Sequence, residues 1–135
     1  MPVNPELQGR SFPPTGPVRV TPERLRAFAE AVFASDPGAS LAPPTFPILV
    51  QQAALDALLQ DPDIGFELQN VVHGEQRFTM DRPIEVGDVL TGSLTVTGIR
   101  TLGSNAMLTA ETLITDAAGD RVGTATSMLL IGGAA

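Results

Sequence analysis

The chain has 135 residues, of which 43% are hydrophobic and 17% are charged, a composition typical of one globular domain. Its formal net charge of -7 leaves no sign of the basic surface that nucleic acids and anionic membranes require. The absence of cysteine excludes disulfides, thiolate nucleophiles and cysteine-based metal sites.

Targeting signals and metal-ligand patterns are also missing from the sequence. The N-terminal residues have no basic region followed by an apolar run, so we expect no signal peptide. No segment reaches about 18 continuous apolar residues, so no membrane span is expected, and we predict a cytoplasmic protein. With one histidine and no carboxylates spaced like a calcium loop, neither a metal nor a cofactor is expected.

The first predicted helix follows an irregular lead-in. Residues 1–17 are rich in proline and glycine, which favours irregular structure. Thr21 can then cap a helix, because Pro22 and Glu23 suit its first turn. Residues 35–38 (SDPG) end this helix. Apolar residues at helical spacing predict one apolar face, made of Leu25, Phe28, Ala29, Val32 and Phe33.

A second helix is predicted from Pro47 to Leu59, after a proline-rich turn. Its apolar residues cover most sides of the helix, which is typical of a helix that is buried in a core. They include Ile48, Leu49, Val50, Ala53, Ala54, Leu55, Leu58 and Leu59. Another layer of the protein must therefore wrap around this helix.

Residues 66–131 predict a succession of strands. Turn signals at residues 73–74, 86–88, 103–105 and 118–120 divide them into segments 66–73, 75–84, 88–100, 105–116 and 121–131. In the third segment, aliphatic residues alternate with threonine and serine, so one face of the strand is expected to be buried and the other exposed to solvent. The sequence therefore predicts a single domain over residues 1–135 with an α+β fold. In this fold an antiparallel sheet wraps around the buried central helix.

Several segments of the chain resemble the MaoC-like dehydratase family, which has the hotdog fold. They are FAEAVFASDP at 28–37, LAPPTFP at 41–47, VVHGEQRFTMDRPIEVGDVLTGSLTVTGI at 71–99 and DAAGDRVGTATSMLL at 116–130. More narrowly, the chain is similar to N-terminal-type members such as the substrate-binding subunit of mycobacterial (3R)-hydroxyacyl-ACP dehydratase. The resemblance implies a hydratase or dehydratase of acyl thioesters with (R) specificity. It also implies that two hotdogs pair and that the acyl-pantetheine of CoA or acyl carrier protein enters between them.

The catalytic motif of that family is incomplete in this chain. The resemblance implies the pattern Gly-Asp-x-Asn-Pro-aliphatic-His after the first helix. If Pro37 is the motif proline, the asparagine falls on Asp36, the aspartate on Ala34 and the histidine on Ala39. The glycine whose amide polarises the thioester carbonyl is replaced near Thr45. The chain therefore resembles a non-catalytic, substrate-binding half. Its implied partner is a catalytic MaoC-like hotdog chain, or a second copy in a homodimer.

The candidate ligand-binding residues are Thr45, Phe46, His73, Gln76 and Phe78. His73 is the only histidine, and Glu75 lies two residues further on. In a regular strand both would point the same way, so a catalytic dyad is geometrically possible. A substrate-lining or interface role is favoured for His73. The ordinary alternatives are a helix cap with a packed Phe46, and a plain alternating strand around Gln76.

Two other functions remain open. One is a self-sufficient homodimeric hydratase or thioesterase that uses His73 and Glu75, or Asp56 on the central helix. The ordinary interpretation of Asp56 is a carboxylate at the solvent-facing edge of that helix. The other function is a non-enzymatic protein that binds acyl thioesters or serves as a scaffold.

Overall fold

The fold consists of one curled sheet with helices on one side of it. The structure, a computed structural model, describes residues 3–36, 38 and 40–133. The two α-helices of these residues are α1 (Pro22–Ala31) and α2 (Ile48–Leu59). The strands are β1 (Val18–Arg19), β2 (Val71–Met80), β3 (Val89–Leu102), β4 (Asn105–Thr115) and β5 (Arg121–Ile131), and short 3₁₀ turns lie at Pro5–Leu7 and Leu68–Asn70.

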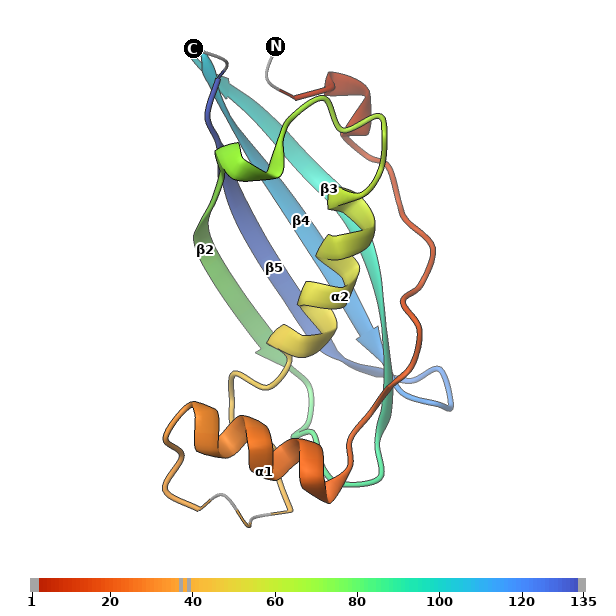
Figure 1. Ribbon diagram of the computed structural model, residues 1–135. Coiled ribbons are helices and arrows are strands. Elements are labelled where there is room, and N and C mark those ends of the chain that lie inside the picture. Colours follow the sequence, from red (N-terminus) through yellow and green to blue (C-terminus); the bar gives the residue numbers. More distant parts are fainter. Residues whose placement is uncertain (1–2, 37, 39, 134–135) are drawn as a thin grey trace.

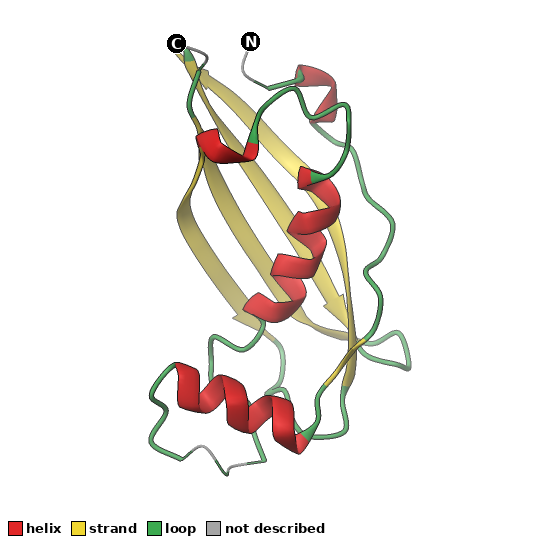
Figure 2. Ribbon diagram, in the orientation of Figure 1, coloured by secondary structure: helices red, strands yellow, loops and turns green. Residues whose placement is uncertain are grey.

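The strands form an antiparallel sheet in the order β1-β3-β4-β5-β2. Figure 1 shows α2 lying along the face of the sheet, while α1 lies beyond one end of it. Figure 2 shows the same arrangement, with the longer strands curling past the central helix. The predicted α+β fold, an antiparallel sheet around a buried central helix, is confirmed.

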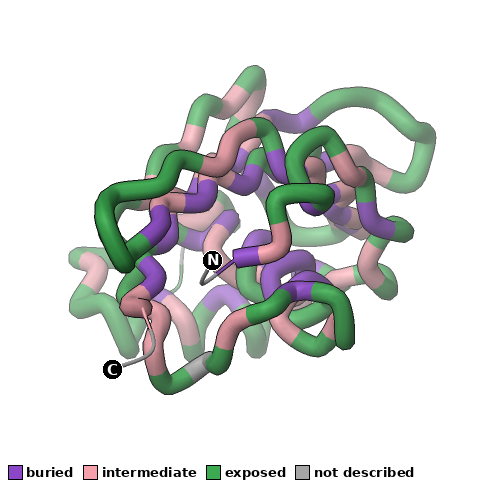
Figure 3. Tube along the Cα trace, turned by 90° about the horizontal axis from the view of Figure 1, so that it is seen from above, coloured by how far each residue is buried: buried purple, intermediate pink, exposed green. Residues whose placement is uncertain are grey.

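The core lies between α2 and the sheet, as the apolar residues on most sides of α2 require. Val50, Ala54 and Leu58 of α2 are buried against alternate residues of β3, β4 and β5. Gly92 lets the helix approach, because a Cβ there would lie 2.8 Å from atoms of both Val50 and Thr112. Figure 3 shows buried positions on the inner segments and exposed ones on the surrounding loops.

The lead-in is ordered although most of it is irregular. Its backbone runs along β3, with hydrogen bonds from Gly9 N to Val96 O (2.7 Å) and from Phe12 N to Leu94 O (2.9 Å). The side chains of Val3, Leu7 and Phe12 join the core. This segment covers the β3 edge of the sheet, whereas β2 pairs, among the described residues, with β5 alone and forms an open edge.

The prediction of two separate strands at residues 66–73 and 75–84 is wrong, because the turn predicted at His73 and Gly74 does not form. Residues 71–80 are one continuous strand, and the register with β5 shifts between His73 and Glu75. Gly74 is thus the extra residue of a β-bulge, which a sequence signal cannot distinguish from a turn. The preceding residues 68–70 form a 3₁₀ turn instead of a strand.

The prediction that Val32 and Phe33 complete the apolar face of the first helix is wrong. Helix α1 ends at Ala31, and Phe33 adopts a left-handed conformation with φ of 59°. Phe33 N then bonds Glu30 O at 3.2 Å and Ala34 N bonds Ala29 O at 2.8 Å, which is a Schellman ending. The turn carries Phe33 away from the core, and its side chain is 93% exposed.

Candidate functional site

The bulge in β2 decides which side chains face the α2 side of the sheet. His73 lies opposite Leu129 and Gln76 lies opposite Ser127, two residues of β5 that are buried on that side. His73 and Gln76 therefore share one face despite their spacing of three. Glu75 lies opposite Met128 and instead binds Arg77 at 2.8 Å. The structure does not bring His73 and Glu75 together as a dyad.

A chain of hydrogen bonds runs from the core to the open edge of the sheet. Gln51 on α2 donates from Nε2 to Ser127 Oγ at 2.6 Å. The Ser127 hydroxyl donates to Gln76 Oε1, and the same oxygen lies 2.8 Å from His73 Nε2. Gln51 and Ser127 are fully buried, whereas His73 is exposed. We call these four residues the polar chain.

The polar chain leaves one donor and one acceptor available at its outer end. An amide oxygen can only accept, so the contact with Gln76 Oε1 requires the proton of neutral His73 to be on Nε2. The Nδ1 lone pair of His73 is then available as an acceptor. Within the described residues, the Gln76 Nε2 group makes only a long contact of 3.5 Å, to Arg77 O, and is available as a donor.

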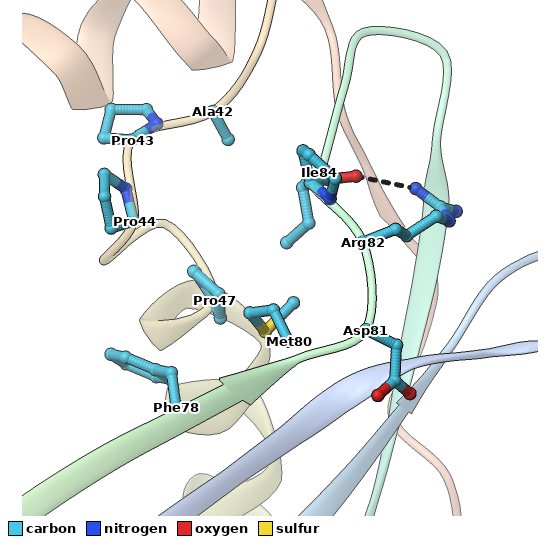
Figure 4. A pocket seen from close by; sticks show the side chains of 10 residues that line it. Ala42, Pro43, Pro44, Pro47, Phe78, Met80, Asp81, Arg82 and Ile84 are labelled. Atoms are coloured by element: carbon cyan, nitrogen blue, oxygen red, sulfur yellow. Dashed lines mark hydrogen bonds between the residues drawn. The ribbon is translucent and has the colours of Figure 1, made fainter.

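A pocket of about 550 Å³ lies between the end of β2 and the segment that precedes α2. Phe78 and Met80 form one wall, on the same face of β2 as Gln76. Figure 4 shows Pro47 beside Met80, with Pro43 and Pro44 along the loop above them. The lining is mostly apolar and consists of Ala42, Pro43, Pro44, Pro47, Phe78, Met80, Asp81, Arg82, Pro83 and Ile84.

The start of α2 offers one free backbone donor near this pocket. Phe46 N bonds Pro43 O at 3.0 Å, and Ile48 N bonds Thr45 O at 3.0 Å. Pro44 and Pro47 have no N–H group. Among the described residues no acceptor is found for the Thr45 N–H, and Thr45 is exposed. The Phe46 side chain, in contrast, is completely buried in the core.

The loop that forms the far wall of the pocket is held by an ion-pair network, the Arg82 network. Arg82 binds both carboxylate oxygens of Asp88, at 2.8 and 3.1 Å, and one oxygen of Asp116 at 3.4 Å. Desolvation opposes the charge of Asp88, but hydrogen bonds from Arg82 and from the Glu85 N–H outweigh it and lower the pKa of Asp88. The Asp120 N–H and Arg82 likewise lower the pKa of Asp116. Every member is therefore held in its charged form.

The remaining candidate is Asp56, which is exposed on α2. It accepts a hydrogen bond from Gln52 Nε2 at 3.1 Å, one helical turn away. The structure does not bring Asp56 into the polar chain or the lining of the pocket. Within residues 3–36, 38 and 40–133, no group of three metal-ligating side chains is found. No helix in the same residues is long and apolar enough to cross a membrane.

Two members of the site, Gln51 and Ser127, were missed by the sequence analysis. Gln51 lies in an apolar run, and the next residue is also a glutamine that proves to be exposed. The signal was therefore present but ambiguous, because a polar residue in a buried helix requires a partner. That partner lies 76 residues away on β5 and could not be identified from the pattern.

Comparison with known sequences places the chain among dehydratase-like domains. The model of the FAS1-like, dehydratase domain region matches residues 6–125. A UPF0336 protein of Leifsonia xyli subsp. xyli is 47% identical over 146 residues, which cover 98% of each chain. A UPF0336 protein of Thermobifida fusca is 36% identical over 148 residues, covering 98% of this chain and 96% of the relative.

Solved structures show the same fold. A chain of the HadBC (3R-hydroxyacyl-ACP dehydratase) complex from Mycobacterium tuberculosis superposes with a TM-score of 0.79 and 24% identity, covering 95% of this chain and 99% of that one. A MaoC-like dehydratase superposes with a TM-score of 0.83 and 25% identity. That match covers 94% of this chain and 42% of the larger protein. The hotdog fold that the family resemblance implies is thereby confirmed.

Proposed function

Since this chain belongs to the MaoC-like dehydratase family of hotdog proteins, we propose that it is a substrate-binding subunit that lacks catalytic residues of its own. It would serve an (R)-specific enoyl-thioester hydratase or 3-hydroxyacyl-thioester dehydratase. The second subunit would be a MaoC-like hotdog chain that carries the intact Asp and His motif. The substrate class is an acyl thioester of CoA or of acyl carrier protein.

The observation that carries this proposal is the loss of the acid–base groups after α1. In the alignment anchored on Pro37, the motif aspartate falls on Ala34 and the motif glycine falls on Phe33. Phe33 has a left-handed conformation, with φ of 59°, which glycine adopts more readily than any other residue. The methyl group of Ala34 can neither activate water nor move a proton. Pro37 and Ala39 themselves lie outside the described residues.

What the chain retains is suited to binding rather than to proton transfer. The free Thr45 N–H can donate to a thioester carbonyl, as the resemblance implies for this position. The pocket beside it offers apolar contacts from Phe78, Met80 and Pro47 to an acyl chain or to the methylene groups of pantetheine. Phe46 contributes by fixing the start of α2 in the core, because its own side chain is buried.

The open edge of the sheet supports pairing with a second hotdog. Strand β2 pairs on one side only, and Val72 near its start is 62% exposed. Open edges of this length are normally covered or paired in native proteins. Structural neighbours of this chain include the HadBC complex and the ChsH1-ChsH2 complex from Mycobacterium tuberculosis. Both names describe hetero-complexes, which favours a different chain over a second copy as the partner.

The test is hydration of crotonyl-CoA by the purified chain, first alone and then with a MaoC-like hotdog chain that has the intact motif. We expect no turnover by this chain alone and turnover by the pair above that of the partner alone. Failure of the partner to bind this chain or to gain activity from it would contradict the proposal. Binding of the thioester without turnover in any combination would favour a non-enzymatic binding protein.

A self-sufficient enzyme is the second candidate, and the hydrogen bonding of His73 favours it. The imidazole is oriented by Gln76 and keeps Nδ1 available to accept a proton, as a general base requires. Turnover by the isolated chain that His73→Ala abolishes would support this candidate. Turnover that survives His73→Ala but not Asp56→Asn would point to chemistry at α2 instead.

A further inference from the structure

The polar chain contains an amide that the fold leaves incompletely satisfied. Gln51 is completely buried in α2, and no partner for its Oε1 is found among the described residues. A buried amide oxygen without a partner destabilises a protein, and an apolar residue of similar shape would avoid that cost. The position of Gln51 therefore calls for an explanation other than stability.

What Gln51 does achieve is the orientation of Gln76. The Ser127 hydroxyl accepts from Gln51 Nε2, which leaves its own proton to donate to Gln76 Oε1. Gln76 Oε1 also accepts from His73, so both of its acceptor positions are used. A glutamine on an open edge strand would otherwise sample many rotamers. Here the buried anchor selects the one in which Nε2 lies beside the backbone of the edge strand, 3.5 Å from Arg77 O.

The outer end of the polar chain is complementary to a secondary amide. Gln76 Nε2 offers a donor for an amide oxygen, and His73 Nδ1 offers an acceptor for an amide N–H. Phe78 follows Gln76 on the same face of β2, about 7 Å further along the strand, and lines the pocket. In an acyl-pantetheine, the ethylene link, the sulfur and the thioester carbonyl lie between the first amide and the acyl chain, which is a comparable separation.

We infer that His73 and Gln76 together bind a secondary amide of the thioester arm, and that Gln51 is a positioning residue for Gln76. This inference rests on the proposed function, because an acyl-pantetheine supplies the amide beside the thioester. Gln51 acts through Ser127 and does not touch the ligand. The incomplete hydrogen bonding of Gln51 is retained because it keeps a donor of Gln76 directed at the ligand.

The ligand side is tested with two crotonyl thioesters, by calorimetric titration of the assembled protein. Crotonyl N-acetylcysteamine carries the amide, whereas S-ethyl thiocrotonate lacks it. Two amide hydrogen bonds should favour the first compound by about tenfold. Gln76→Glu keeps the oxygen that accepts from Ser127 and His73 but removes the Nε2 donor, so this preference should disappear. Equal affinity of the wild type for both compounds would overturn amide recognition and leave the proposed function standing. Binding of neither compound would overturn both.

The positioning role is tested with Gln51→Met against Thr112→Val. The Thr112 hydroxyl is also buried without a partner, but no hydrogen bond links it to the polar chain. Both variants remove an unsatisfied polar atom, so each should unfold at an unchanged or higher temperature. Only Gln51→Met should lose the tenfold preference for the amide compound. A lower unfolding temperature of Gln51→Met with an unchanged preference would overturn the inference, because Gln51 would then be structural only.

Discussion

The Arg82 network and the polar chain are both built from side chains of distant segments, but only the first is fully satisfied. In the Arg82 network, a guanidinium joins Asp88 and Asp116, and backbone N–H groups complete the hydrogen bonding of both carboxylates. In the polar chain, Gln51 Oε1 has no partner inside the described part of the protein. The Arg82 network therefore stabilises the fold, whereas the polar chain includes one unpaired oxygen whose cost we assign to the orientation of Gln76.

The difference shows that the two networks fix different kinds of structure, a loop in one case and a single side chain in the other. The loop at residues 81–88 connects β2 to β3 and is bonded to neighbouring segments through its backbone, with hydrogen bonds from Ala42 N to Ile84 O and from Gly87 N to Val20 O. The Arg82 network adds a charge-assisted clamp to the β4–β5 turn. Gln76 lies on a strand whose backbone is already fixed, and only its side chain needs an orientation. The loop requires interactions that stabilise it, whereas Gln76 requires a fixed side-chain orientation. Substitutions in the two networks should therefore have different effects on the free energy of unfolding.

The largest expected effect is that of Arg82→Ala. The change leaves Asp88, whose side chain is 13% exposed, charged without its main partner. After allowance for the partial exposure of Arg82, we expect a loss of about 2 kcal/mol of unfolding free energy, measured by urea denaturation. Arg77→Ala is the matched control, because the exposed pair of Arg77 and Glu75 should contribute less than about 0.5 kcal/mol. Equal effects of the two changes would show that the Arg82 network is not a clamp.

The contribution of Asp88 should depend on pH in a defined direction. Its pKa in the folded protein is lowered from the ordinary 3.8, so the folded state favours the charged carboxylate. This stabilisation is fully present above the unfolded pKa and is lost as the pH falls through the folded one. The unfolding temperature of Asp88→Asn should therefore lie below that of the wild type at pH 7. The gap should begin to close near pH 3.8, the ordinary pKa, and should vanish only below the folded pKa. A gap that persists in acid would assign the loss to packing rather than to charge.

The free energy of unfolding should fall when one member of the polar chain is replaced and should largely recover when its bonded partner is replaced as well. Ser127→Ala leaves both the Nε2 and the Oε1 of Gln51 buried without partners among the described residues, and we expect a loss of about 1–2 kcal/mol in unfolding free energy. Adding Gln51→Met to this variant removes the unpaired amide and should recover most of that loss. Urea denaturation of the two single variants and the double variant closes the cycle. If the changes in unfolding free energy of the two single variants simply add in the double variant, Gln51 and Ser127 are not coupled.

The fold could be predicted from the sequence where the signal is local. The apolar residues on most sides of α2 identified the buried helix, and the alternation in residues 90–97 identified β3. The bulge at Gly74 could not be predicted, because it is defined by pairing with β5, more than fifty residues away. This single shift places Gln76 rather than Glu75 beside His73.

The candidate site could be predicted only in part, for the same physical reason. His73, Gln76 and Phe78 lie on one face of β2, and the backbone of Thr45 presents a free donor. Phe46, in contrast, belongs to the core. A motif identifies residues and spacing, but the direction of a side chain depends on its register with other strands.

Phe33 extends the comparison to a position where the cost to stability comes from a strained backbone conformation rather than from an unpaired polar group. It is the one residue other than glycine with positive φ in the described part of the chain, and its exposed ring contributes little packing. Phe33→Gly should therefore raise the unfolding free energy by about 0.5–1 kcal/mol, because release of left-handed strain outweighs the greater freedom of the unfolded chain. Thermal unfolding measures the gain. Phe33→Ala is the control, since it removes the ring but keeps the Cβ and should not stabilise. A similar gain in both variants would show that the exposed ring, rather than the left-handed backbone, is the source of the cost.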